Sequence, residues 1–562
     1  MPLRILLLAT SANGLTRRVS RALIGAGHQV NTAVVRGSAD IEHAAAAPAD
    51  LIVAPYLKAR IPANVYGNPV VPCVVIHPGP IGDRGGSSLD WAISEGEPTW
   101  GVTAIGVVAE LDAGPIWASR TCTLPQGRKS DVYNSVIADL AVEIALEVAA
   151  KAADPAFEPA DPTRADRPVP HAGPRPLMRQ ADRAFSWTSP ADSILRRIHA
   201  ADGSPGVRTT IDGHLVHVYD AHRGRHDVTA PAGAVIARHH HAIEIACGEH
   251  SSIWVGHLRV EQGQHLSWKA PAAAALVSVG YDLAAVPVPE TTEHFRDITC
   301  RQLGAGVVEV AFHAYNGAMS TGLCERLTRT VTACASRRDI RLLVLRGRHG
   351  TAFSNGLHLG EIGISTEPAA TAWRNINAIN GLCRALLRFP APTIAAVTGS
   401  AGAGGAMLAL TCDTVVAAAR AVFDPHYATM GLAGSEFHSL TLPRRVGTAA
   451  ATDLLNDCEP LDTRAALEIG FVDYVVPDAT FETSLAALIA DTFTPGERMA
   501  PHAVARCDSR LGELPAALLD AAERRELAEM RRNLFDNNLG FHERLAEFLG
   551  ARPVLSQAKS AA

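Results

Sequence analysis

The chain has 562 residues, of which 47% are hydrophobic and 19% are charged, and its formal net charge is −6. This length exceeds what one hydrophobic core supports, so we expect several domains. The mildly acidic balance gives no reason to expect a nucleic-acid partner. No run of about 18 apolar residues indicates a membrane span, and the first residues resemble a buried strand more than a signal peptide. We therefore expect a cytoplasmic protein.

The cysteines and histidines give no sign of a metal site. The ten cysteines are scattered without a C-x-x-C pair, which favours reduced thiols. His239, His240 and His241 are consecutive, so in a strand they would point to alternate faces. We expect a surface run there and predict no bound metal.

The first 155 residues predict an α/β domain with a Rossmann-like parallel sheet. Short apolar runs alternate with a helical pattern, which is typical of a sheet covered by helices. We expect a helix over residues 16–24 and strands over residues 5–8, 30–35, 51–54 and 70–76. Residues 153–176 are rich in proline, alanine and aspartate and predict a linker.

Two further domains are expected after this linker. Residues 176–285 predict a small β-barrel-like domain, with one helix over 191–200 and short strands within 206–219 and 233–255. A second linker near 286–293 precedes an α/β domain over residues 295–562. Its strands are expected at 307–312, 341–345 and 393–397, and its tail after Leu514 is expected to be helical.

The first candidate site combines a histidine and an aspartate near strand ends. His77 closes an apolar run and is followed by a glycine-rich turn, and Asp112 lies on a later loop. Open α/β sheets bind ligands at the carboxyl ends of their strands. Histidine titrates near neutral pH, so a His77–Asp112 pair can move a proton and stabilise an oxyanion.

The order of motifs around this pair resembles the 10-formyl-tetrahydrofolate-dependent formyltransferases. The motifs are His77-Pro78, Gly82-Asp83-Arg84-Gly85-Gly86, Gly96-Glu97, Gly101-Val102-Thr103 and Asp112-Ala113-Gly114. Residues 185–221 look like the small C-terminal barrel of the longer members. The resemblance implies catalysis by His77 and Asp112. It also implies folate contacts from Asn13, Arg17, Tyr56 and Arg84.

One position departs from this family. Its members usually have an asparagine two residues before the histidine, which donates a hydrogen bond to the formyl oxygen, and here that position is Val75. A fold that only binds folate is therefore the alternative. We favour activity, because losing one oxyanion donor typically slows a reaction by about 10²–10³ and leaves some catalysis.

The second candidate site lies in two glycine-rich stretches of the C-terminal domain. The first is Phe353-Ser354-Asn355-Gly356, and the second runs from Val397 through Gly404-Gly405 to Thr411-Cys412-Asp413. Together with 442–447 they resemble the crotonase superfamily of enoyl-CoA hydratases and isomerases, which folds as a ββα-spiral. The resemblance implies a coenzyme A thioester whose carbonyl is bound by the N–H groups of Leu357 and Gly404. It further implies a CoA site at Asn316, Gly356, Gly405 and His426.

Hydratase chemistry is not expected from this second site. Met407 stands where a hydratase has its first catalytic glutamate, and Tyr427 stands at the second. Methionine cannot move a proton. We therefore predict that Tyr427 and the nearby Glu436 handle the proton.

Three motifs extend the resemblance over the chain: Asn13-Gly14-Leu15-Thr16, Gly82-Asp83-Arg84-Gly85 and Tyr315-Asn316-Gly317-Ala318-Met319-Ser320. With them, the chain resembles the HypX-type maturation proteins of NiFe hydrogenases over nearly its whole length. The resemblance implies an enzyme that transfers formyl from 10-formyl-tetrahydrofolate to coenzyme A and decarbonylates formyl-CoA to carbon monoxide, in transient contact with hydrogenase maturation proteins. Two alternatives stay open. One is a formyltransferase with an amine acceptor and an accessory CoA-binding domain, and the other is a non-catalytic maturation scaffold.

Overall fold

The computed structural model describes residues 2–11, 13–263, 265–289, 294–304, 306–348, 351–494 and 498–550. The chain divides into two compact units. Unit 1 comprises Met1–Thr209, His217–Gly233 and Cys247–Ile253, and unit 2 comprises Thr210–Val216, Ala234–Ala246 and Trp254–Ala562. Residues 290–293 of the second predicted linker and the last twelve residues of the predicted third domain lie outside the described residues. The predicted domain limits stay predictions.

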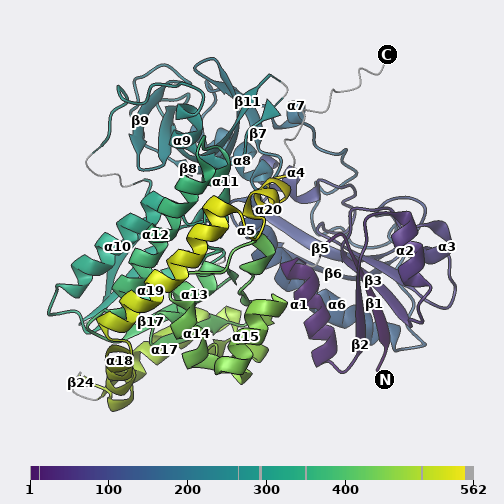
Figure 1. The fold of residues 1–562 in the computed structure, drawn as a ribbon. Coiled ribbons are helices and arrows are strands. Elements are labelled where there is room, and N and C mark those ends of the chain that lie inside the picture. The colour runs from purple at the N-terminus through teal and green to yellow at the C-terminus, as the bar shows by residue number, and fades with distance from the viewer. Residues whose placement is uncertain are drawn as a thin grey trace. The chain divides into compact units, whose positions relative to one another are not determined.

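Unit 1 contains a six-stranded sheet with the order β2-β1-β3-β4-β5-β6 (Figure 1). The pairs β1·β2, β1·β3 and β3·β4 are parallel, whereas β5 is antiparallel to both of its neighbours, β4 and β6. The predicted fourth strand starts three residues late, because the N–H groups of Val70 and Val71 donate to Asn68 Oδ1 in a turn. The strands are β1 (Arg4–Ala9), β2 (Gln29–Val34), β3 (Leu51–Tyr56), β4 (Cys73–His77), β5 (Thr99–Gly106) and β6 (Ile116–Thr123).

Helices cover both faces of this sheet, as the α/β prediction requires. Successive β1 side chains point to opposite faces. Ile5 and Leu7 join the core cluster with α1 and α6, and Leu6 and Leu8 join the cluster with α2 and α3. The helices of this region are α1 (Gly14–Gly25), α2 (Ser38–Ala45), α3 (Ala63–Tyr66), α4 (Ser88–Glu95), α5 (Lys129–Val132), the π-helix η1 (Tyr133–Ile137) and α6 (Ala138–Ala152).

The segment predicted as a linker, residues 153–176, packs on unit 1. Ala160 exchanges two backbone hydrogen bonds with Ile116, of 2.8 and 2.9 Å, and Arg175 N–H donates to Arg84 O at 3.0 Å. Val169 is buried among the core residues of unit 1. The linker prediction is wrong in this respect, because Val169, Ala172 and Phe157 pack on the core of unit 1.

A second sheet has the order β7-β8-β11-β10-β9, with β12 and β13 pairing β11. The helix predicted over 191–200 is present as α8. The elements are α7 (Gln180–Arg183), α8 (Ala191–Ala201), β7 (Val207–Ile211), β8 (His214–Arg223), β9 (Val235–His239), β10 (Ala242–Ala246), β11 (Ser252–Gln262), β12 (His265–Leu266), β13 (Ala270–Pro271) and α9 (Ala272–Val277).

The main sheet of unit 2 has the order β14-β15-β16-β17-β19-β22. Alternate residues of strand β16 point to opposite faces of this sheet. Leu343 and Leu345 pack with helices α10 and α12, while Leu342 and Val344 pack with α17. The elements are β14 (Ile298–Gly304), β15 (Val307–Phe312), β16 (Leu342–Gly347), β17 (Thr393–Val397), β19 (Thr414–Ala418), β22 (Tyr474–Val476), α10 (Thr321–Ala335), α12 (Pro368–Leu387) and α17 (Phe481–Asp491).

Smaller elements and a helical tail complete unit 2. The three-stranded sheet β18-β20-β21 lies next to α13, which follows the second glycine-rich stretch. Two further short strands, β23 and β24, form a pair. These elements are the 3-10 helices η2 (Tyr315–Gly317), η3 (Ala428–Met430) and η4 (Asp478–Thr480), α11 (Leu359–Gly363), β18 (Ala401–Gly402), α13 (Gly404–Leu410), β20 (Val422–Asp424), α14 (His438–Val446), α15 (Thr448–Asp457), β21 (Leu461–Asp462), α16 (Thr463–Glu468), β23 (Phe493–Thr494), β24 (Arg498–Met499), α18 (Pro501–Glu513), α19 (Ala516–Arg531), the π-helix η5 (Arg532–Asp536) and α20 (Phe541–Phe548).

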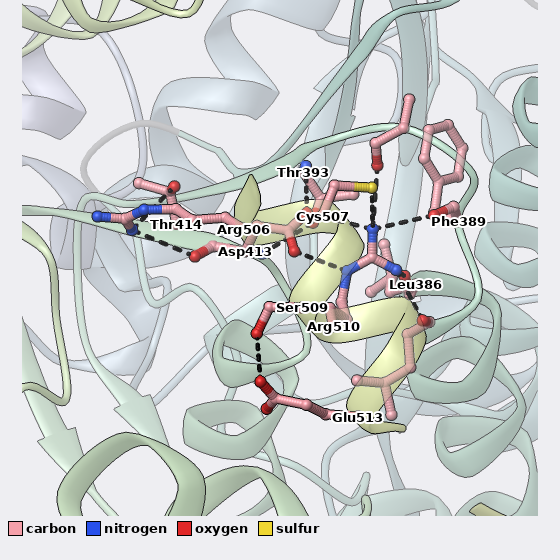
Figure 2. Close-up of polar contacts among 12 residues, drawn as sticks. Leu386, Phe389, Thr393, Asp413, Thr414, Arg506, Cys507, Ser509, Arg510 and Glu513 are labelled. Carbon is pink, nitrogen blue, oxygen red and sulfur yellow. Dashed lines mark hydrogen bonds and ion pairs between the residues drawn. The ribbon is translucent and has the colours of Figure 1, made fainter. Parts of the chain in front are cut away.

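A buried ion pair fastens the start of this tail to the core (Figure 2). Arg510 of α18 donates to both carboxylate oxygens of Asp413, at 2.8 and 3.2 Å, and to the carbonyl groups that end α12. Asp413 also accepts from the N–H and hydroxyl of Thr393. The Thr411-Cys412-Asp413 motif therefore has a structural role. Among the described helices, none has the length and apolarity to cross a lipid bilayer.

Candidate functional sites

The first candidate site lies at the edge of the unit 1 sheet where parallel strands end. His77 is the last residue of β4, Tyr56 is the last residue of β3, and Asn13 follows β1. Because these three strands are parallel, their carboxyl ends share one edge. Open α/β sheets bind ligands at this edge.

Two carboxylates flank the His77 ring. Asp83 Oδ2 lies 2.7 Å from His77 Nε2, and Asp112 Oδ2 lies 3.5 Å from Nδ1. Both His77 and Asp83 are buried. Because a carboxylate only accepts when ionised, Asp83 can hold a proton on Nε2 and so orient the ring. The predicted pair of His77 and Asp112 is brought together, although its 3.5 Å separation is too long for a good hydrogen bond.

Asp83 was not singled out from the sequence, although it lies only six residues after His77. The loop between them is tightly built. A Cβ added to Gly79 would lie 2.3 Å from Asp83 Oδ2 and 2.5 Å from His77 Nε2, so glycine is needed there. The Pro78 carbonyl accepts from Ser88 Oγ and Trp100 Nε1. An acidic residue inside a glycine-rich turn after the histidine was the available signal.

Three of the four predicted folate contacts have other partners in this structure. Asn13 Oδ1 accepts from the Thr16 N–H at 2.9 Å and so caps helix α1. Tyr56 packs edge-on against Tyr133, and Arg84 pairs with Glu110 at 2.6 Å. Arg17 lies in the first turn of α1. Their contact with folate stays a prediction.

Val75 is half-buried in β4, two residues before His77. Residues two apart in a strand point to the same face, so the side chains of Val75 and His77 share one face of the sheet. A valine side chain has no hydrogen-bond donor. Val75 therefore leaves a formyl oxygen without the donor that asparagine supplies in the formyltransferases.

The second candidate site is a cavity of about 550 Å³ in unit 2. Two side chains of opposite character mark it: Glu436 is its only lining carboxylate within the described residues, and Lys269 is one of its cations. The lining residues are His257, Arg259, Trp268, Lys269, Tyr315, Asn316, Ala318, Asn355, Leu357, His358, Leu359, Gly360, Ile376, Ala403, Gly404, His426, Tyr427, Met430, Leu432, Glu436, Met530, Phe548 and Leu549.

Leu357 and Gly404 lie side by side in this cavity, as an oxyanion hole requires. A Cβ added to Gly356 would lie 3.3 Å from Gly404 N, which shows how closely the two backbone segments approach. Gly404 is the first residue of α13, whose initial N–H groups have no partner within the helix. Within the described part of the chain, neither the Leu357 nor the Gly404 N–H has a protein acceptor. Both N–H groups are available to a carbonyl oxygen.

Tyr427 and Glu436 form a buried hydrogen-bonded pair beside these N–H groups. The Tyr427 hydroxyl donates to Glu436 Oε2 at 2.7 Å. Burial raises the pKa of the Glu436 carboxyl above its usual range, and hydrogen bonds from Tyr427 and Ser435 oppose this in part. Burial, and then the charge of Glu436, raise the pKa of the Tyr427 hydroxyl well above its usual value. Such shifts are typical of groups that exchange protons in a dry site.

Glu436 lies directly against Gly404 of the predicted oxyanion hole. A Cβ added to Gly404 would lie 2.4 Å from Glu436 Oε1. Met407, one turn further along α13, is fully buried in the core and does not line the cavity. Met407, at the position of the first hydratase glutamate, therefore contributes only to core packing.

The predicted CoA contacts have different positions. Asn316 and His426 line the cavity, and His426 Nδ1 lies 2.7 Å from Asp424 O. Gly356 packs on Gly404, as described above. Gly405 packs against the backbone of Ser354, since an added Cβ would lie 2.1 Å from Ser354 O. Contact of these four residues with CoA stays a prediction.

A pair of histidines in the cavity wall was missed from the sequence. His358 Nε2 lies 3.2 Å from His257 Nε2, and the two rings are parallel. His358 Nδ1 accepts from the Glu361 N–H, so the proton lies on His358 Nε2 and is donated to His257. Burial, and then His257, lower the pKa of His358 to about 3. His358 directly follows Leu357, which was the only sequence signal for it.

Segment 257–269 contributes two cations to the cavity, Arg259 and Lys269. Lys269 Nζ donates to the Tyr315 hydroxyl at 3.2 Å. These residues lie in the predicted middle domain, and nothing local in the sequence places them in the crotonase-type cavity.

The run of three histidines, His239 to His241, was predicted to lie at the surface, and it does so only in part. His240 is exposed, but the His241 side chain is 16% exposed and lies 3.5 Å from Asp297.

Comparisons with known proteins identify the family of this chain. A family model described as Enoyl-CoA hydratase/isomerase matches residues 302–505, and one described as Formyl transferase, C-terminal domain matches residues 177–275. Hydrogenase maturation factor HoxX from Bradyrhizobium diazoefficiens is 35% identical over 560 residues, which cover 98% of this chain and 95% of the relative. The chain belongs to the HoxX/HypX family of hydrogenase maturation factors.

Solved HypX structures extend the agreement to the whole fold. HypX from Aquifex aeolicus in complex with tetrahydrofolic acid is 30% identical, with a TM-score of 0.87 and coverage of 100% of both chains. A probable enoyl-CoA hydratase from Rhodobacter capsulatus is 34% identical over 170 residues, 30% of this chain and 63% of the relative. The α/β fold class, with formyltransferase and crotonase modules, is thereby confirmed for this HypX-family chain.

Proposed function

We propose that this chain makes carbon monoxide for NiFe-hydrogenase maturation. It transfers the formyl group of 10-formyl-tetrahydrofolate to coenzyme A and then decarbonylates formyl-CoA to CO and CoA. The observation that carries this proposal is the position of Glu436, whose carboxylate lies against Gly404 at the oxyanion hole. Membership of a family with a tetrahydrofolate-bound member supports the first step.

The first step uses the residues around His77. The CoA sulfur attacks the formyl carbon, and the bond from that carbon to the folate nitrogen breaks. His77 Nδ1 takes the thiol proton and returns it to the departing nitrogen, while Asp83 holds Nε2 and keeps the ring oriented. Two bound reactants need not find each other in solution, which lowers the barrier. Because Val75 donates nothing to the formyl oxygen, we expect a rate about 10²–10³ below that with an asparagine there.

The second step uses the cavity of unit 2. The N–H groups of Leu357 and Gly404 hold the thioester oxygen, which places the formyl hydrogen beside Glu436. The Glu436 carboxylate takes that proton, the C–S bond breaks, and the electron pair leaves with sulfur. The proton returns to the thiolate, so the products are CO and CoA. No oxidant or reductant is consumed.

Two features of the cavity favour this reaction over hydration. A hydratase needs two carboxylates to add water, and buried Met407 replaces one of them. Burial raises the pKa of Glu436, which makes its carboxylate a stronger base for a C–H proton.

The charge of the cavity also suits the proposed carrier. Arg259 and Lys269 place two positive charges in its lining, which favours a phosphorylated ligand such as CoA.

A blocked variant separates the two steps. Glu436→Gln, incubated with 10-formyl-tetrahydrofolate and CoA, should accumulate formyl-CoA and release no CO. Glu523→Gln, on helix α19 and paired with Arg384, serves as the matched control. CO release by Glu436→Gln at the wild-type rate would remove Glu436 from the mechanism. Formyl transfer to an amine with no need for CoA would favour the amine-acceptor alternative, and ligand binding without turnover would favour the scaffold. Cytoplasmic location and transient contact with hydrogenase maturation proteins are part of the same proposal.

A further inference from the structure

The turn that carries Glu436 has an unusual backbone. Glu436 and Phe437 are consecutive non-glycine residues with φ of 61° and 57°. This left-handed conformation is sterically disfavoured for residues with a Cβ, so surrounding contacts must hold it. The turn precedes helix α14, and its three successive N–H groups at 435, 436 and 437 all have side-chain acceptors.

Three buried side chains from later or earlier helices hold this turn. Asn380 Oδ1 of α12 accepts from the Glu436 N–H at 2.8 Å. Glu526 Oε2 of α19 accepts from the Phe437 N–H at 3.0 Å, and its Oε1 accepts from the Ser439 N–H at 2.9 Å. Asn533 Oδ1 of η5 accepts from the Ala433 N–H at 2.8 Å.

These three residues are at most 4% exposed, and none of them lines the cavity. They therefore touch no substrate, and the two neutral residues, Asn380 and Asn533, can act only through the turn. Glu526 also caps the start of α14, where a carboxylate is stabilised by the unpaired N–H groups of the helix. If the turn relaxed to a right-handed conformation, the Glu436 side chain would leave Gly404 and the oxyanion hole.

We propose that Asn380 and Glu526, assisted by Asn533, are positioning residues for proton transfer by Glu436. The inference rests on the proposed function, because it assigns these residues to the same site. The groups that face the Glu436 carboxylate are Tyr427, Ser435, His438, Glu526 and the buried thiols of Cys324 and Cys383. Only Asn380, which is neutral, holds the Glu436 N–H itself.

The test compares Asn380→Leu with Asn380→Asp. Leucine has nearly the shape of asparagine but accepts no hydrogen bond, whereas aspartate keeps an acceptor and adds a negative charge. In Asn380→Leu we expect faster amide hydrogen exchange over residues 433–439 and about a hundredfold lower kcat for CO release from added formyl-CoA, with KM unchanged. In Asn380→Asp we expect the rate to return, with the acid limb of the pH profile moved to higher pH, because the added charge disfavours the Glu436 carboxylate.

Controls separate the possible failures. Asn377→Leu changes an exposed asparagine one turn earlier on α12 and should alter neither readout. If Asn380→Leu does not fold, Asn533→Leu carries the same prediction, since leucine accepts no hydrogen bond from the Ala433 N–H. If the wild type releases CO and both variants match its rate, the positioning proposal is wrong. If the wild type releases no CO from formyl-CoA, the proposed function fails first, and the positioning role falls with it.

Discussion

The Tyr427 hydroxyl donates a 2.7 Å hydrogen bond to a Glu436 carboxylate that is 2% exposed. Removing an ionised carboxylate from water is unfavourable, so we expect this pair to lower the free energy of unfolding. The other carboxylate oxygen, Oε1, lies next to Gly404. The proposed proton acceptor and the proposed oxyanion hole thus lie in one cavity, and the following predictions depend on this arrangement.

Glu436→Gln should stabilise the protein at neutral and alkaline pH. Burial raises the folded pKa of Glu436 above the unfolded value of 4.5. The contribution of Glu436 to the free energy of unfolding is therefore fully present below pH 4.5, where the group is protonated in both states. It is lost as the pH rises through the folded pKa. Glutamine keeps the acceptor for Tyr427 and never ionises. Thermal unfolding should show a Tm above that of the wild type at pH 8 and nearly the same Tm at pH 4, and a pH-independent difference would contradict this.

Gly404→Ala should slow CO release by about 10²–10³, the typical effect of losing one oxyanion contact. The new Cβ would lie 2.4 Å from Glu436 Oε1 and displace the carboxylate. Helix stability should not suffer, since alanine is the better helix former. The matched control is Gly381→Ala on α12, whose added Cβ would lie 3.9 Å from Thr328 Oγ1. Equal rates in the two variants would show that Gly404 is not at the reacting centre.

His77→Ala should abolish formyl transfer from 10-formyl-tetrahydrofolate and leave CoA binding intact. Asp83→Asn should slow the same step by about 10², because it loosens the ring that moves the proton. Release of tetrahydrofolate, followed by absorbance, measures the step, and calorimetry measures CoA binding. Loss of CoA binding in His77→Ala would mean that the first site is misassigned.

Arg510→Met should reduce the free energy of unfolding by about 3–5 kcal/mol, because it leaves the buried Asp413 carboxylate without its ion-pair partner. Arg506→Met is the control. Arg506 pairs with Asp473 at 2.7 Å but is 39% exposed, so a loss of about 0–1 kcal/mol is expected. Urea unfolding measures both variants. A loss below 1 kcal/mol in Arg510→Met would contradict a structural role for the Thr411-Cys412-Asp413 motif.

The sequence predicted regular elements best where hydrophobic patterning alone determines them. The strand expected at 393–397 is β17 with the same limits, because every residue of it is buried. The strand expected at 70–76 begins late at Cys73, because a turn at Asn68 takes the first N–H groups. Patterning could not show that residues 153–176 would pack on unit 1.

Site residues could be predicted from the sequence only where they lie within a local motif. His77, Tyr427 and Glu436 lie in recognisable segments, and the structure brings each to a neighbouring charged or polar group. Lys269 lies 88 residues before Leu357 in the chain, so its place in the same cavity is a matter of tertiary packing. The left-handed backbone of Glu436 likewise has no sequence signal, since such positions usually carry glycine or asparagine.

The most direct measurement is CO in the headspace, detected with a haem-protein trap after the purified chain is incubated with 10-formyl-tetrahydrofolate, with and without CoA. We predict CO above the protein-free control, and only when CoA is present. CO that forms equally well without CoA would contradict CoA as the formyl carrier. No CO at all, with both ligands shown to bind, would contradict the proposed function.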